Sequence, residues 1–233
     1  REVAAVALRD ARVSVFGASA SGDVAPVATT ALAAQPWDLF YDAAGDVLYV
    51  ALVNGEVAIF DGYVAAGFGA SGLSRNIAPV DGAGTKISVN LHGIDYDYAS
   101  DKLVVTDVGA ANAAASPSFA ADGSIYVIAD ARTADGNVVP TRVIEGPLSR
   151  LGNPVDAILD GPDLRVAEKA NDLLLVFRGV LNGPSGDAAP DLAVTSNKPE
   201  SLAFEPAWED VIDTSDLDDP SYGVRALAVV SNP

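Results

Sequence analysis

Four short segments of this chain each carry, near their start, a polar residue that could be one ligand of a shared metal ion. The side chains in question are Asp38, His92, Asp156 and Glu200. Carboxylate oxygens and an imidazole nitrogen are common ligands of Ca²⁺ and Zn²⁺. If the four segments converge on a central channel, these residues predict a metal site at its mouth. The alternative is a polar, water-filled channel lining that holds no ion.

A second acidic cluster lies near the end of the chain, just before Pro220. Its members are Asp210, Asp213, Asp216, Asp218 and Asp219. Loops with alternating carboxylates can provide the roughly six to eight oxygen ligands that Ca²⁺ takes. The cluster lacks the glycine and the distal glutamate of a helix-loop-helix calcium loop. We therefore predict a candidate calcium site at Asp213, Asp216 and Asp218. The alternative is a solvated acidic loop that binds no ion.

Other kinds of site chemistry find little support in the residue types present. There is no cysteine, which excludes disulfides, thiolate metal sites and cysteine nucleophiles, and His92 is the only histidine. No Gly-x-Ser-x-Gly elbow occurs, and no helix is predicted after the glycine-rich segment 67–72. We assign no catalytic residues and no organic cofactor, which leaves Ca²⁺ as the cofactor to test.

The candidate metal ligands belong to a phrase that recurs along the chain. It occupies Pro36–Asp42, Leu91–Asp97, Pro154–Asp160 and Pro199–Glu205. After each phrase comes a β-rich run such as 47–51, and an apolar run such as 56–60 comes third. A more polar run such as 74–77 comes fourth. Units of this kind, about 50 residues long, predict four antiparallel strands per repeat, with the phrase as the innermost strand.

Two recurrent features of the repeat have a structural interpretation. A carboxylate closes each phrase, and we expect it to cap the following hairpin by accepting backbone N–H bonds: Asp42, Asp97, Asp160 and Glu205. The loop before the fourth strand reads Gly-Asp/Asn-x-x-Pro at 22–26, 136–140 and 186–190. Its proline is expected to open an outer strand whose N–H need not pair.

The predicted fold is an all-β propeller formed by residues 1–233 as one domain. It comprises about five four-stranded repeats: 1–30, 36–79, 91–145, 154–195 and 199–233. The first repeat lacks its inner strand and the last lacks its outer strand. The two explanations are that the chain is part of a six-bladed propeller, or that a neighbouring chain completes the terminal blades.

The pattern resembles the NHL-like repeats of bacterial secreted β-propeller proteins. The third repeat carries the resemblance best, from Ser124–Ile128 through the loop Gly136–Pro140 to Thr141–Ile144. Proteins of this kind include lactonases, protein-binding scaffolds and surface proteins, so the resemblance implies a fold and leaves the activity open. Lactonase-like six-bladed members hold a catalytic metal with inward carboxylates and an asparagine. The present chain matches that set only in part, because Gly93 and Ser201 occupy two of the four aligned places.

Charge and composition limit the partners. The net charge is −18, and 49% of the residues are hydrophobic. Such an acidic surface repels nucleic acid and anionic lipid, so we expect neither nucleic-acid binding nor membrane insertion. Absence of methionine, with Arg1 in first place, favours a processed chain that has lost a signal peptide, and we expect a secreted or cell-surface location in a bacterium.

These observations favour a secreted, salt-adapted propeller that is not an enzyme. Its expected role is a scaffold that binds a protein partner or associates with itself through its terminal strands. One alternative is a metal-dependent hydrolase, similar to the lactonases, with its site in the central channel. The other is a structural subunit of an extracellular filament.

Overall fold

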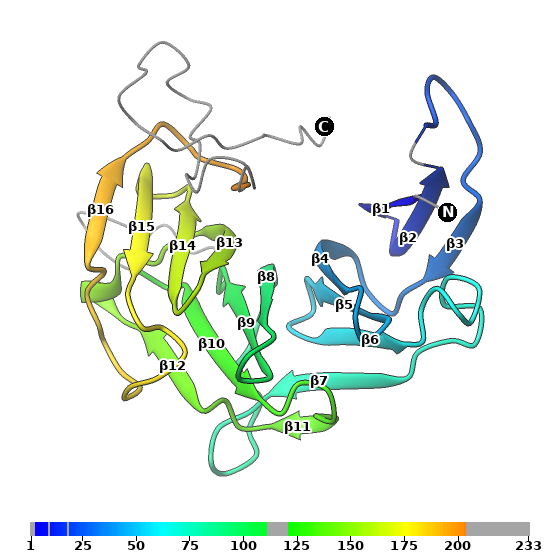
Figure 1. The fold of residues 1–233 in the computed structure, drawn as a ribbon. Coiled ribbons are helices and arrows are strands. Elements are labelled where there is room, and N and C mark those ends of the chain that lie inside the picture. Colours follow the sequence, from blue (N-terminus) through cyan, green and yellow to red (C-terminus); the bar gives the residue numbers. More distant parts are fainter. Residues whose placement is uncertain (1–2, 9, 18, 111–120, 204–233) are drawn as a thin grey trace.

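Four β-sheets follow one another along the chain and surround a common centre (Figure 1). The computed structural model describes residues 3–8, 10–17, 19–110 and 121–203. Within these residues the one helical element is a single 3₁₀ turn, η1 (Pro147–Ser149). That part of the chain therefore holds no helix long and apolar enough to span a membrane. The all-β prediction is confirmed.

The first two sheets come from the N-terminal part of the chain. The first sheet consists of β1 (Val3–Leu8), β2 (Arg12–Gly17) and β3 (Ala28–Ala31). The second has β4 (Pro36–Asp42) innermost, then β5 (Val47–Leu52), β6 (Val57–Asp61) and β7 (Arg75–Pro79). A fifth strand, β11 (Gly136–Val138), pairs with the outer edge of β7.

The next two sheets repeat the same order from the centre outward. The third contains β8 (Leu91–Asp97), β9 (Lys102–Asp107), β10 (Ser124–Ala129) and β12 (Arg142–Glu145). The fourth contains β13 (Pro154–Asp160), β14 (Asp163–Glu168), β15 (Leu173–Phe177) and β16 (Leu192–Thr195). The first three recurring phrases of the sequence are β4, β8 and β13, with the predicted boundaries. The fourth phrase starts in the described coil 199–203 and continues outside the described residues.

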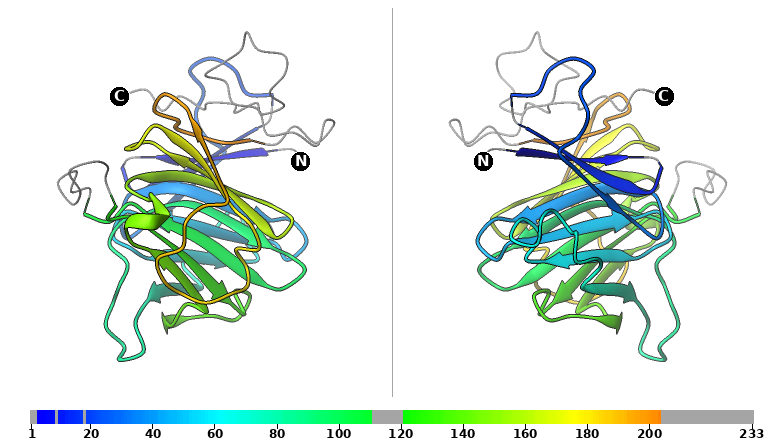
Figure 2. Two further views of the ribbon diagram at one scale, coloured as in Figure 1. Left: turned by 90° about the vertical axis from the view of Figure 1, so that its left-hand side faces the viewer. Right: turned by 90° about the vertical axis from the view of Figure 1, so that its right-hand side faces the viewer.

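The inner strands contact one another around the centre, β4 against β8 and β8 against β13. The sheets stack face to face, as the side views show (Figure 2). Apolar residues that alternate along the strands fill the space between the sheets. Tyr49, Ile59 and Ile128 are buried between the second and third sheets, while Val127 and Leu175 are buried between the third and fourth. Burying such side chains stabilises the stack by about 1.5–3 kcal/mol each.

The contacts of β1 identify its place in the first sheet. In the later sheets the second strand touches the inner strand of the following sheet, as β5 touches β8 and β9 touches β13. β1 touches β4 in the same way. It is therefore the second strand of its repeat, as the sequence predicts, and no described strand occupies the innermost place of the first sheet.

The Gly-Asp/Asn-x-x-Pro loops do more than lead into the outer strands. The segment 136–138 runs parallel to β7 of the preceding sheet, with Gly136 opposite Ile77. Gly186 forms a parallel bridge with Ile144 of β12 in the same sense. We call such a segment a strap. This role is not apparent from the sequence, because parallel pairing between two repeats leaves no short-range pattern.

Candidate functional site

Asp38, near the start of β4, joins two inner strands. One oxygen, Oδ1, accepts the N–H of Leu39 in the same strand at 2.7 Å. The other, Oδ2, accepts the N–H of Ile94 in β8 at 3.1 Å. The carboxylate therefore links the second sheet to the third.

The same arrangement recurs twice further along the ring. Asp95 of β8 accepts the N–H of Tyr96 at 2.7 Å and that of Leu159 in β13 at 2.7 Å. Asp156 of β13 accepts the N–H of Ala157 at 2.8 Å and, at 2.6 Å, that of Leu202 in the segment that follows the fourth sheet. The hydroxyl of Ser201 adds a bond to Asp156 at 2.9 Å. We call Asp38, Asp95 and Asp156 the tie carboxylates.

The backbone near the start of each inner strand is suited to these ties. The pairing register shifts between Pro36 and Asp38 and again between Pro154 and Asp156. In β8 the shift falls between Leu91 and Ile94. A bulge interrupts the ladder locally, so one N–H needs an acceptor other than the neighbouring strand. For Ile94 that acceptor is the carboxylate of Asp38.

In β8, Gly93 occupies the position that Asp38 has in β4 and Asp156 has in β13, and packing explains the difference. A Cβ atom here would lie 2.5 Å from the backbone N of Ala157 and 2.8 Å from the carbonyl carbon of Asp156. The two inner strands therefore approach too closely for any side chain at position 93. In the sequence this glycine stands where a metal ligand was expected, and the close packing of β8 on β13 explains it.

Burial sets the protonation behaviour of the tie carboxylates. Burial, with Asp156 adding repulsion, raises the pKa of Asp38 well above its ordinary range. Burial likewise raises the pKa of Asp156 to about 6 and raises that of Asp95, although each accepts backbone N–H bonds that oppose the shift. Charged groups removed from water favour their neutral form, so these aspartates bind protons more readily than exposed ones.

Trp37 lies across three inner strands. Its indole stacks on the ring of His92 with 3.7 Å between the centroids, and its Nε1–H donates to the carbonyl of Val155 at 3.1 Å. His92 is 5% exposed, and its Nδ1 has no partner in the described structure. Burial, with the nearby charge of Lys169, lowers the pKa of His92 to about 3. The imidazole is thus neutral at physiological pH.

The fourth candidate ligand, Glu200, points to a different partner. Its carboxylate pairs with the ammonium group of Lys169, which follows β14. Both side chains are partly exposed. This ion pair connects the fourth sheet to the segment after β16. Glu200 is therefore the candidate ligand that the inner strands enclose least.

Asp38, His92, Asp156 and Glu200 thus lie in the same region, but their side chains are not arranged as the ligands of one metal ion. Among the described residues, no group of three His, Asp or Glu side chains is arranged to hold an ion. Asp38 and Asp156 direct their oxygens at backbone N–H groups instead. The acidic cluster Asp213, Asp216 and Asp218 lies outside the described residues.

The carboxylates that close the phrases have the predicted structural role in two repeats. Asp42 accepts the N–H groups of Ala44 and Gly45, both at 2.9 Å. Asp97 accepts the N–H of Ser100 at 2.8 Å. Asp160 instead pairs with Arg165, and Glu205 lies outside the described residues. Hairpin capping is confirmed for Asp42 and Asp97.

Two buried carboxylates at the ends of second strands escaped the sequence analysis. Asp107 accepts the N–H groups of Val89, Asn90 and Gly109. Glu168 accepts those of Gly152, Asn153, Ala170 and Asn171. The sequence signal that could have found Asp107 and Glu168 is an acidic residue directly after an apolar run. These residues hold the loops that lead into β8 and β13.

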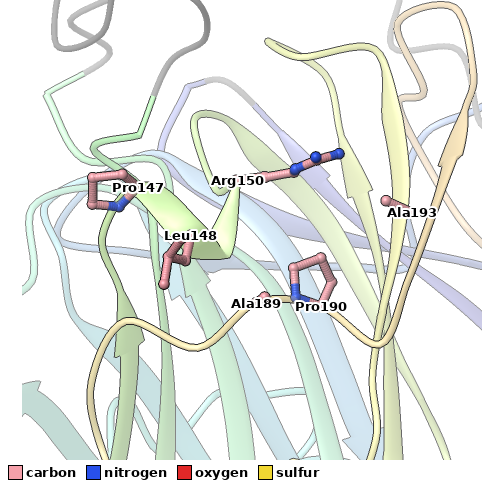
Figure 3. Close-up of a pocket in the computed structure, with 6 residues that line it drawn as sticks. All are labelled: Pro147, Leu148, Arg150, Ala189, Pro190 and Ala193. Carbon is pink, nitrogen blue, oxygen red and sulfur yellow. The ribbon is translucent and has the colours of Figure 1, made fainter.

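A shallow apolar hollow lies on the outside of the molecule, between the third and fourth sheets (Figure 3). Pro147, Leu148 and Arg150 of the loop after β12 face Ala189, Pro190 and Ala193 of the fourth repeat. The strap of that repeat is fixed here, since Oδ1 of Asp187 accepts the N–H of Leu148 at 2.7 Å. The hollow is therefore the outer side of a joint between two sheets.

Comparison with known proteins supports the fold and no activity. A chain of the mitotic checkpoint complex matches with a TM-score of 0.55 and 18% identity over 90% of this chain. A putative 6-phosphogluconolactonase from Bacteroides fragilis matches with a TM-score of 0.55 and 12% identity over 81%. This chain spans about half the length of each, 52% and 50% respectively. No family model and no curated protein matches the sequence. The chain has a β-propeller fold.

Proposed function

We propose that this chain is a non-enzymatic propeller scaffold that binds protein at the outside of a bacterial cell. The observation that carries the proposal is the use of the tie carboxylates. Asp38, Asp95 and Asp156 each accept an N–H of their own strand and another from the next repeat. Polar groups at the centre of the ring thus hold the sheets together, where an enzyme of this architecture would need them for a metal or a substrate.

The surface of the described chain provides features suited to protein contact. Several large apolar side chains are exposed on loops and outer strands: Val139 at 55%, Leu148 at 60% and Leu192 at 52%. Leu148 also lines the apolar hollow between the third and fourth sheets, which offers an apolar contact to a protein partner. The repeat motifs support membership among the NHL-like propellers, and the lack of cysteine is compatible with a secreted bacterial protein.

The test of this proposal is a search for the rival activity. The purified protein is incubated with a panel of γ- and δ-lactones in the presence of Ca²⁺, Zn²⁺ or Mn²⁺, and ring opening is followed by proton release. We expect no turnover above that of the matched variant Asp156→Asn. Metal-dependent hydrolysis that Asp38→Asn and Asp156→Asn both abolish would overturn the scaffold proposal in favour of an enzyme at the channel.

A further inference from the structure

Three aromatic rings meet where the inner strands of the second and third sheets end. Phe40 lies near the end of β4, Tyr96 lies near the end of β8, and Tyr98 follows β8 directly. The ring centroids of Tyr96 and Tyr98 are 5.0 Å apart, and the centroid of Phe40 lies 6.0 Å and 6.1 Å from them. Tyr98 is 49% exposed, whereas Tyr96 is 3% exposed. The group therefore presents the ring of Tyr98 to solvent on a buried aromatic base.

The carboxylate of Asp42 lies near these rings with one oxygen unused. Burial raises the pKa of Tyr98, and the nearby charge of Asp42 adds to this shift. Asp42 is itself fully buried. Its Oδ1 accepts the N–H groups of Ala44 and Gly45, whereas its Oδ2 has no hydrogen-bond partner in the described structure. A buried acceptor left without a donor is costly, so this oxygen favours a ligand that brings one.

The guanidinium group of Arg132 lies beside this oxygen without bonding to it. Its Nη2 is 4.0 Å from Oδ2 of Asp42, which is too long for a hydrogen bond. The guanidinium also lies 5.7 Å from the ring centroid of Tyr96. The side chain of Arg132 is 47% exposed and makes no hydrogen bond within the described residues. A donor and an acceptor thus stand side by side, and neither satisfies the other.

The backbone around these side chains is held in place. Oδ1 of Asp101 accepts the hydroxyl of Tyr96 at 2.8 Å and the N–H of Arg132 at 3.1 Å. Arg75 of β7 donates from Nη1 to the carbonyl of Ala131 at 2.9 Å. The loop that carries Arg132 is therefore fixed to both the second and the third sheet, and only the end of its side chain is free to move.

The charges select the kind of ligand that suits this place. A cation would meet the guanidinium of Arg132, and an anion would meet Asp42 as well as the net charge of −18. A neutral hydroxyl group both donates and accepts, so it can donate to Oδ2 of Asp42 and accept from Arg132. A pyranose ring carries several such hydroxyls and also has an apolar C–H face, which gains from packing on an aromatic ring.

We infer that five residues form a binding site for a neutral sugar: Phe40, Asp42, Tyr96, Tyr98 and Arg132. We call them the sugar site. The apolar face of a pyranose packs on Tyr98, and one of its hydroxyls lies between Asp42 and Arg132, whose half-exposed side chain moves aside to admit it. The inference goes beyond the proposed protein scaffold, because it gives the chain a carbohydrate ligand.

Saturation-transfer NMR on the whole chain tests the inference. The probes are the methyl glycosides of glucose, mannose and galactose at millimolar concentration, which differ in the orientation of single hydroxyls. We expect saturation transfer to at least one of them. Titration with that glycoside should shift the ring resonances of Tyr98 and the Nε–H resonance of Arg132, which places the sugar at these residues.

Three variants test the roles of the side chains. Tyr98→Ala removes the exposed ring and should lower the affinity about tenfold. Asp42→Asn keeps an acceptor for the hairpin N–H groups but replaces the free oxygen by a donor, and should lower the affinity at least about tenfold. Arg178→Ala is the control, because it removes an exposed arginine outside the sugar site and should leave the affinity unchanged. If Asp42→Asn fails to fold, Tyr98→Ala still decides, since its side chain is half-exposed.

A cationic probe separates the sugar from a competing ligand. On the sugar account, Arg132→Ala weakens glycoside binding and leaves N-acetylarginine amide unbound. If Arg132→Ala instead gained affinity for N-acetylarginine amide, the rings and Asp42 would be a cation site and the inference would be wrong. Absence of transfer to all three glycosides would also overturn it, as would equal affinity in the wild type and Tyr98→Ala. None of these outcomes bears on lactone hydrolysis, so the scaffold proposal is decided by its own assay.

Discussion

At the scale of single residues, the chemistry of the central aspartates is that of structural hydrogen bonding. The same carboxylates that could serve a metal can instead accept backbone N–H groups of the next repeat, and for Ile94 that N–H lies beside a bulge. The structure decides between these roles through the partners it provides: Asp38 meets Ile94, Asp95 meets Leu159 and Asp156 meets Leu202. A carboxylate buried for this purpose retains a raised pKa, and this has measurable consequences.

The first residue-scale prediction concerns Asp156. Its pKa is raised from the ordinary value of 3.8 to about 6, so the folded state binds the proton more tightly than the unfolded state. Its contribution to stability is present below pH 4 and is lost as the pH rises through 6. Relative to Asp156→Asn, the free energy of unfolding of the wild type should therefore fall by about 2.5 kcal/mol between pH 4 and pH 7. Urea denaturation of both proteins at several pH values measures this difference, and a constant difference would contradict it.

His92 should behave in the opposite sense. Its pKa is lowered from 6.5 to about 3, so the folded state excludes the proton that the unfolded state accepts. The stability it contributes is present above pH 6.5 and is lost as the pH falls towards 3. Because phenylalanine keeps a ring on Trp37 and cannot be protonated, His92→Phe should gain about 2 kcal/mol relative to the wild type between pH 7 and pH 5. The same urea titrations test it, and parallel curves for the two proteins would refute the burial of a neutral imidazole.

At the scale of strands and loops, much of the fold follows from the sequence, because each strand repeats in a local pattern. The boundaries of β4, β8 and β13 are the predicted ones, since a bounded alternation of apolar and polar residues is a short-range signal. The straps were missed because their partners lie about 40 to 60 residues away in another repeat, as with Gly186 and Ile144 or Gly136 and Ile77. The tie bonds were missed for the same reason: Asp38 could be identified as polar and inward, but its acceptor role depends on a bulge in a strand 56 positions away.

An element-scale prediction concerns the closest approach of two inner strands. Gly93→Ala places a methyl group against the backbone of Asp156 and Ala157, which cannot move without separating β8 from β13. We expect a loss of about 1–3 kcal/mol or more, as for other overpacked positions. Gly17→Ala at the end of β2 is the matched control, because a Cβ there meets nothing within 4 Å. Thermal denaturation of both variants tests the prediction, and equal melting temperatures would contradict the close approach.

At the scale of the whole molecule, the dominant feature is the charge of −18. Like charges on one domain repel and favour expansion, and salt screens this repulsion. The melting temperature should therefore rise by several degrees between about 10 mM and 1 M NaCl, where the screening length falls from about 30 Å to about 3 Å.

Calcium separates general screening from a specific site. If the acidic residues 210–219 bind Ca²⁺, millimolar CaCl₂ should raise the melting temperature beyond the value in NaCl of equal ionic strength. The scaffold account expects equal values, and an excess response to Ca²⁺ that disappears in Asp213→Asn would restore the calcium site.

The central claim is that the aspartates of the inner strands tie successive sheets together, and amide hydrogen exchange measures this most directly. Exchange is followed by NMR for the N–H groups of Ile94, Leu159 and Leu202 in the wild type, Asp38→Ala and Asp95→Ala. Leaving one buried N–H without an acceptor costs about 1–3 kcal/mol, equivalent to roughly a five- to 150-fold loss of protection. Asp38→Ala should lower the protection of Ile94 and leave Leu202 close to its wild-type value, and Asp95→Ala should do the same to Leu159. Unchanged protection of Ile94 and Leu159 in these variants would show that the aspartates serve another purpose at the centre of the ring.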